Sequence, residues 1–199
     1  MLLLIYELCT MLLPMLLIWK IYIDKKDVPF WIKICLGIFG IYYAGVLHFT
    51  GAGTVFDIKL YGFDFGNDQI NILPFSQQID IIVYLLNFVL LMPCGFLLPL
   101  IAEKLESLGS IFCVSFLISM LIEISQLFNN RKTDIDDLIL NIGGAVIGYV
   151  IYRLVVKAFP QISNRKKLKV FDITIYILVI TLGRFFLFAE FYFARIFYM

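Results

Sequence analysis

The sequence predicts an all-α membrane protein: a six-helix transmembrane bundle with a short extracytoplasmic hairpin, or lid, between the second and third spans. Hydrophobic residues make up 62% of the 199 residues and charged residues only 16%, and the mean hydropathy is +0.95. A soluble domain of this length has no interior large enough to bury so many apolar side chains. The lipid bilayer is therefore the expected surroundings of the chain.

Six apolar runs approach or exceed the roughly 20 residues that a membrane-spanning helix needs. They are Leu2–Trp19, Phe30–Phe49, Ile79–Ile101, Leu108–Phe128, Leu138–Val156 and Ile173–Phe188. No basic segment precedes the first run, and Lys20 follows it directly. We therefore expect the first run to remain as a span rather than to be removed as a signal peptide.

The lysines and arginines predict the orientation of these spans, because cytoplasmic loops of membrane proteins are enriched in both. The odd-numbered loops and their flanks hold eleven of them: Lys20, Lys25, Lys26, Lys33, Lys104, Arg153, Lys157, Arg165, Lys166, Lys167 and Lys169. The even-numbered loops hold three: Lys59, Arg131 and Lys132. We therefore expect the odd-numbered loops to be cytoplasmic and both termini to be extracytoplasmic.

Two loops have distinctive compositions. In the second loop, Thr54–Gly66 alternates polar and apolar side chains around Gly62, a pattern that predicts a hairpin. Its aromatic side chains suit the membrane interface, so the hairpin is expected on the outer leaflet, either as a lid over the helices or as an ordinary interfacial loop. The basic fifth loop, Pro160–Lys169, is expected to contact anionic lipid. The net charge of +1 gives no reason to expect nucleic acid as a partner.

Polar side chains inside the spans are the best indication of a site, because a charge near the bilayer centre costs about 2.5–3.5 kcal/mol on insertion scales. The predicted topology places several in the outer half of the membrane: Glu7, His48, Asn87, Glu123, Asn141 and Arg184. They are expected to converge on one side of the protein.

The densest polar segment is a predicted helix–loop–helix corner. Glu123 and Gln126 are three residues apart on one helix, and Asp137 and Asn141 are four apart on the next, so a tight turn can bring the two polar faces together. Arg131, between them, is expected to bridge Glu123 and an aspartate, or to bind a phosphate or carboxylate ligand. The alternatives are a structural clasp and a ligand or reaction site.

Three ordered segments carry a family resemblance. They are Ser119–Phe128 with Arg131 and Asp134–Tyr149; Ile70–Phe75, an Asn-x-x-Pro-Phe element; and Asn87–Pro99, an Asn-x-x-x-x-x-Pro-x-Gly-Phe helix. Together they resemble the VanZ-like family of bacterial membrane proteins over about residues 30–157. The predicted division of the chain is thus 1–29, an N-terminal span and cytoplasmic loop; 30–157, a VanZ-like membrane domain; and 158–199, a basic loop and C-terminal span.

The resemblance implies a role in resistance to glycopeptide antibiotics of the teicoplanin type, in the bacterial cell membrane and without an established reaction. Such a protein would engage a lipoglycopeptide drug or a lipid-linked envelope precursor at the outer leaflet. The residues expected to bind this ligand are Asn71, Pro74, Phe75, Asn87, Glu123, Gln126, Arg131, Asp136, Asp137 and Asn141.

Two other classes of function stay open. A membrane enzyme acting on a lipid head group or polyprenyl phosphate would use Glu123 or Asp137 as base and Arg131 as anion clamp. The chain has a single His and none of the known hydrolase motifs, so a non-enzymatic role is favoured. A small transporter, with Glu123 and Arg184 as a proton-coupled pair, ranks third. We expect no cofactor and no metal, because closely spaced aspartates at a turn are more typical of helix capping.

Overall fold

The computed structural model describes residues 1–62, 69–76, 80–162 and 166–198. Six helical segments of this part are long and apolar enough to cross a membrane, which confirms the all-α six-span prediction and a multi-pass membrane protein. They are α1 (Leu2–Ile18) continued by the π-helical turn Trp19–Ile23, α2 (Phe30–Phe49), α4 (Ile81–Leu90) with α5 (Met92–Ile101), α6 (Leu108–Leu127), α7 (Ile135–Ala158) and α8 (Val170–Leu187).

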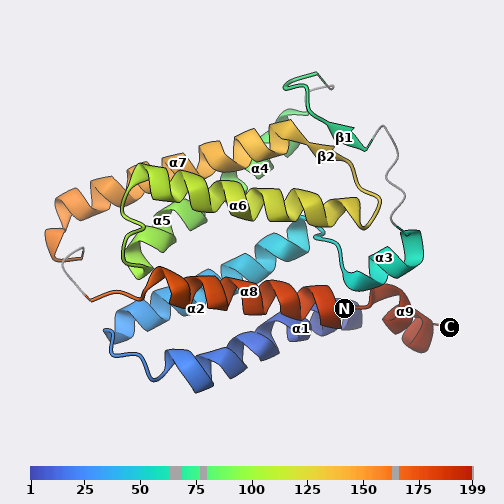
Figure 1. The fold of residues 1–199 in the computed structure, drawn as a ribbon, viewed down its shortest axis with the longest axis horizontal. Coiled ribbons are helices and arrows are strands. Elements are labelled where there is room, and N and C mark those ends of the chain that lie inside the picture. The colour runs from blue at the N-terminus through green and yellow to red at the C-terminus, as the bar shows by residue number, and fades with distance from the viewer. Residues whose placement is uncertain (63–68, 77–79, 163–165, 199) are drawn as a thin grey trace.

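Shorter elements gather at one end of the bundle (Figure 1). They are α3 (Val55–Tyr61), β1 (Ile70–Asn71), β2 (Thr133–Asp134) and α9 (Glu190–Tyr198). Both chain termini lie at this end as well, and we call it the terminal end. The turn Pro160–Ile162 lies at the opposite end, with the loops after the first, third and fifth spans. The orientation of the two ends across the membrane stays a prediction.

The hairpin predicted for Thr54–Gly66 is wrong, because Val55–Tyr61 is a helix. A capping box begins it: the Asp57 backbone N–H donates to Thr54 Oγ1 at 3.3 Å, and the Thr54 backbone N–H donates to Asp57 Oδ2 at 2.7 Å. This reciprocal cap satisfies two backbone groups at the helix start and outweighs the strand-like alternation. Residues 63–66, the remainder of the predicted hairpin, lie outside the described part.

The helix α3 packs beside α8 and α9. The Phe56 ring lies 5.8 Å from the Tyr192 ring, edge to face. The segment thus contacts the C-terminal part of the chain, and a lid role for it stays a prediction.

The spanning helices form two groups, seen in Figure 1 as the lower and upper halves of the bundle. In one group α1, α2 and α8 pack on one another, and in the other α7 packs on α4, α5 and α6. The packing of α2 on α5 joins them. The third span is divided at Leu91, which has φ −96° and ψ 5°, and Pro93 stands in the first turn of α5. Proline is tolerated there because the first turn of a helix needs no backbone N–H.

Glycines set how closely α7 approaches the divided span. A Cβ at Gly144 would lie 1.7 Å from the Phe88 carbonyl oxygen, and one at Gly148 would lie 1.9 Å from that of Met92. Only glycine permits this backbone contact, because any larger residue would place a Cβ against the carbonyl oxygen. The position of α4 relative to α7 is therefore tightly fixed.

Candidate functional site

A cavity of about 650 Å³ lies between α4, α6 and α7, closed on one side by the end of α2. We call it the α4–α6–α7 cavity. Its polar lining includes six residues that the sequence analysis selected: Asn87, Glu123, Gln126, Arg131, Asp137 and Asn141. Thr50 and Lys132, which the sequence analysis did not select, line it too.

The turn between α6 and α7 brings the two polar faces to this cavity. The chain reverses at Asn130, whose φ of 62° is left-handed, a conformation that asparagine tolerates better than most residues. The Arg131 backbone N–H donates to the Gln126 carbonyl at 3.1 Å. Asp134 then caps α7 by accepting from the Asp136 backbone N–H at 3.0 Å. Since α7 begins at Ile135, Asp137 stands in its first turn.

Two carboxylates, those of Glu123 and Asp137, line the cavity. Glu123 is buried, and its Oε2 accepts from the Asp134 backbone N–H at 3.2 Å. Asp137 Oδ1 accepts a hydrogen bond from Asn87 Nδ2. In the part of the chain that the structure describes, neither carboxylate forms an ion pair. The cavity wall therefore holds two acidic groups that no cation of the described residues pairs with.

The predicted bridge from Arg131 to Glu123 or an aspartate is wrong. Arg131 Nη1 instead donates to the Thr50 carbonyl at 2.5 Å, and Gln126 Nε2 donates to the same oxygen at 2.8 Å. The last carbonyls of a helix have no partner within the helix. The end of α2 supplies such acceptors, so Arg131 binds them and its side chain stays exposed.

Asn71, Phe75 and Asp136 lie beside the cavity rather than in its lining. The strands β1 and β2 pair in parallel, with Asn71 opposite Asp134, and Asn71 Nδ2 donates to both Asp134 carboxylate oxygens at 3.1 Å. Asp136, which is 1% exposed, accepts from the Phe75 backbone N–H at 2.8 Å and from the Tyr84 hydroxyl. These contacts fix the loop that follows β1 to the start of α7.

Pro74 is exposed in the turn before Phe75, and it lines no part of the cavity. Tyr84 was not selected from the sequence, although its position three residues before Asn87 on α4 was a signal that both face the start of α7. Thr50 gave no signal, because it acts through its backbone carbonyl.

Two buried amide oxygens at the cavity have no hydrogen-bond partner among the described residues: Gln126 Oε1 and Asn141 Oδ1. The amide nitrogens of the same side chains are both used. Gln126 Nε2 donates to Thr50, and Asn141 Nδ2 donates to Ser119 Oγ at 3.0 Å. Because the surrounding protein covers both oxygens, they lie behind the cavity surface rather than on it.

The model of one protein family, described as VanZ/LLP1, matches residues 34–156. The chain belongs to the VanZ/LLP1 family. No curated protein and no solved structure matches it. The match contains every residue that lines the α4–α6–α7 cavity. The VanZ/LLP1 segment therefore holds the candidate site whole, whereas α1 and α8 lie outside it.

A second polar cluster joins α1 and α8 to this VanZ/LLP1 segment. Glu7 Oε1 accepts from Arg184 Nε at 3.0 Å and lies 2.9 Å from Arg184 Nη2, while Glu7 Oε2 lies 2.7 Å from His48 Nδ1. The predicted pairing of Arg184 with Glu123 is therefore wrong. Of the polar residues expected in the outer half, Glu7, His48 and Arg184 form this cluster and the others line the cavity.

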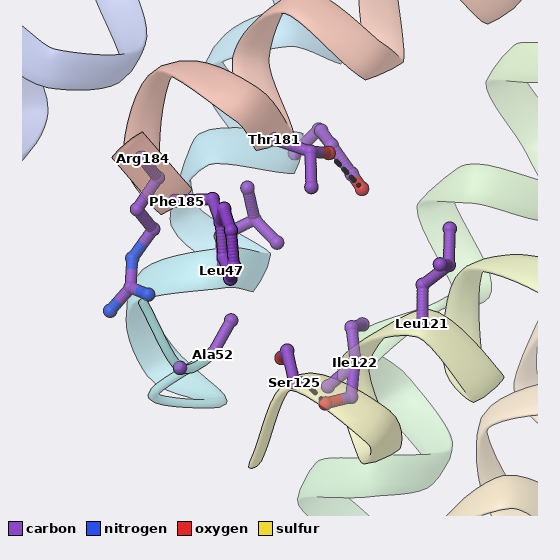
Figure 2. Close-up of a pocket in the computed structure, with 10 residues that line it drawn as sticks. Leu47, Ala52, Leu121, Ile122, Ser125, Thr181, Arg184 and Phe185 are labelled. Carbon is purple, nitrogen blue, oxygen red and sulfur yellow. Dashed lines mark hydrogen bonds between the residues drawn. The ribbon is translucent and has the colours of Figure 1, made fainter. Parts of the chain in front are cut away.

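Arg184 also borders a small pocket of about 30 Å³ between α8 and α6 (Figure 2). Thr181, Arg184 and Phe185 lie on one side of it, and Ile122 and Ser125 on the other. Its volume suffices for a water molecule, which needs at least about 10–15 Å³ on this measure. It is too small for a substrate. The α4–α6–α7 cavity is the candidate ligand site of this VanZ/LLP1 protein because it gathers the polar side chains of Asn87, Glu123 and Asp137 beside an apolar border.

Proposed function

We propose that this VanZ/LLP1 protein resides in the bacterial cell membrane and contributes to resistance to teicoplanin-type glycopeptides by binding an amphiphile at the outer leaflet. The observation that carries the proposal is the α4–α6–α7 cavity, which combines buried polar groups with an apolar border. At about 650 Å³ it falls within the range of small-molecule pockets, about 300–1,000 Å³.

The apolar part of the lining faces the surroundings of the helices. Phe49 is 80% exposed, Leu86 63% and Val89 48%. In a bilayer such side chains meet acyl chains. A ligand with a lipid tail would place the tail along Leu86 and Val89 and its polar part beside Glu123 and Asp137, whether it is a lipoglycopeptide drug or a lipid-linked envelope precursor.

The proposal requires the terminal end to face outward, as the loop charges predict. The test is cysteine labelling with a membrane-impermeant reagent in intact cells, in a cysteine-free background. Lys132→Cys, at the cavity, should react at once, and Glu103→Cys, at the opposite end, only after permeabilisation. The reverse pattern would place the cavity in the cytoplasm and contradict an outer-leaflet role.

The function itself is tested by drug tolerance in a susceptible bacterium that expresses the chain. We expect the minimal inhibitory concentration of teicoplanin to rise more than that of vancomycin, because only a tailed drug can bury an acyl chain along α4. Leu86→Arg places a charge on the lipid-facing border and should abolish the rise, whereas Leu121→Arg, which is on α6 and also exposed to lipid, controls for insertion cost. Equal tolerance to both drugs would argue against a tail-binding site.

A membrane enzyme acting on a lipid head group or polyprenyl phosphate is the second candidate. It is favoured by one observation: two carboxylates that form no ion pair among the described residues lie beside the cationic Arg131 and Lys132, and an unpaired carboxylate can act as a general base. Its test is incubation of the purified protein with drug or lipid, followed by mass spectrometry. A modified product that accumulates with time and disappears in Glu123→Gln would establish catalysis in place of binding.

A further inference from the structure

We infer that the ligand of the α4–α6–α7 cavity presents a primary ammonium group to Glu123 and Asp137. The inference rests on the proposed binding function and names the chemistry of the bound head group.

The first argument is the direction of the hydrogen bonds in the cavity wall. Each amide nitrogen of the lining donates into the protein: Asn87 to Asp137, Gln126 to Thr50, and Asn141 to Ser119. The oxygens Gln126 Oε1 and Asn141 Oδ1 have no donor among the described residues, and protein atoms cover both. Apart from the exposed Arg131 and Lys132, the charged groups of the lining are the acceptors Glu123 and Asp137, which suit a ligand that donates hydrogen bonds.

The second argument is charge. Glu123 is 5% exposed, and neither it nor Asp137 has an ion-pair partner in the described part of the chain. A buried carboxylate without a compensating cation is unfavourable. Arg131 and Lys132, the cationic residues of the lining, are exposed. A cationic ligand that reached Glu123 and Asp137 would supply a compensating charge.

The third argument selects the kind of cation. A primary ammonium is compact and has three N–H donors in a tetrahedral arrangement, which suits the two carboxylates of the cavity lining. A quaternary ammonium carries the same charge and no donor. The described residues contain no group of three or more His, Cys, Asp or Glu side chains arranged to hold a metal ion. The apolar border formed by Leu86 and Val89 indicates that the ligand also carries an alkyl chain.

The experiment compares head groups on one alkyl chain, using the full chain purified in dodecyl maltoside and calorimetric titration. The probes are dodecylammonium, dodecyltrimethylammonium and dodecanol. We expect dodecylammonium to bind about tenfold to a hundredfold more tightly than the other two, since hydrogen bonds to charged groups are the strong ones. This comparison uses the unmodified protein and does not depend on a variant that folds.

Variants then assign the effect to the cavity. Glu123→Gln and Asp137→Asn keep the side-chain shapes and should each weaken dodecylammonium binding about tenfold, whereas Glu103→Gln, an exposed residue at the opposite end, should leave it unchanged. Native mass spectrometry with phosphatidylethanolamine and phosphatidylcholine identifies which kind of molecule supplies the ammonium group. Selective retention of phosphatidylethanolamine indicates a lipid head group, and retention of neither lipid beside tight dodecylammonium binding indicates a free amine of another amphiphile.

Several results would overturn the inference. Equal affinity for all three dodecyl probes would agree with amphiphile binding but contradict the inference that the ligand presents an ammonium group. Binding of dodecylammonium that survives both carboxylate substitutions would move it to another site, and its displacement by millimolar Mg²⁺ would identify a metal site instead. Binding of none of the probes would contradict the proposed binding function itself.

Discussion

Two buried acidic regions lie at the terminal end of the bundle, and they differ in what surrounds the carboxylates. Glu7 has both oxygens occupied, one by Arg184 at 2.9 Å and 3.0 Å and the other by His48 at 2.7 Å. Among the described residues, Glu123 accepts from a single backbone N–H, at 3.2 Å, and Asp137 from one side-chain amide, that of Asn87. A buried acid that is neutralised within the protein joins helices, whereas one that is left uncompensated is available to a ligand.

The largest effect is expected at the neutralised region. Arg184→Met leaves Glu7 buried without its main cation, and breaking a buried pair from one side costs about 3–5 kcal/mol. The thermal unfolding midpoint in detergent should fall by many degrees. Arg195→Met, on the exposed face of α9, is the matched control and should have little effect. If Arg184→Met were as stable as the wild type, Glu7 would not be the joint between α1 and α8.

A second, smaller effect is expected where α7 meets α4. Gly144→Ala adds a Cβ 1.7 Å from the Phe88 carbonyl oxygen, so the helices must separate, at a cost of about 1–3 kcal/mol. Gly109→Ala, whose Cβ would meet nothing within 4 Å, should be neutral or stabilising. The same unfolding measurement distinguishes them. Equal midpoints would mean that the wall of the cavity is not set by backbone contact.

The third prediction concerns Glu123, where the expected change in stability has the opposite sign to that expected for Arg184→Met. Glu123→Gln replaces a buried carboxyl group that has no ion-pair partner in the described residues, so we expect stability to stay within about 1 kcal/mol of the wild type, on the higher side, while dodecylammonium binding falls. Unfolding and titration of the same preparation provide both readouts. A large loss of stability would show that Glu123 holds the fold as Glu7 does.

The smallest effect is expected at the opposite end. Lys166 Nζ lies 2.5 Å from Asp27 Oδ2, both side chains are exposed, and Lys166 lowers the pKa of Asp27. A lowered carboxyl pKa stabilises the fold above the ordinary pKa of 3.8 and loses this effect as the pH falls through the lowered value. Because solvent screens the pair, Lys166→Ala should leave the midpoint at pH 7 unchanged. A clear shift of the unfolding midpoint would mean that this exposed ion pair contributes as much to stability as a buried one.

The six spans follow from the apolar runs, because a bilayer requires long apolar helices whatever their packing. The spacing of Glu123 with Gln126, and of Asp137 with Asn141, also predicts that both pairs face one space. The partner of Arg131 could not be predicted, since the Thr50 carbonyl is a backbone group at the end of another span. The α3 helix was missed because a capping box of two residues outweighed an alternating pattern.

The distance in sequence between Glu7 and Arg184 explains why their pairing was missed as well. The expectation that both lie at the same end of the bundle is confirmed by their contact, because height along the bundle follows from position along a span. The choice among several charged groups at the same depth depends on which helices are neighbours, and no local pattern encodes that.

The pairing of β1 with β2 has a consequence for the order in which the protein is made. The two strands lie on either side of the third and fourth of the six spans. While the ribosome is still adding residues before 133, Asn71 and the Phe75 backbone N–H have none of the acceptors that Asp134 and Asp136 later supply. These hydrogen bonds of the loop after β1 therefore cannot form until two further helices have been synthesised. The site becomes complete only when the fifth span begins.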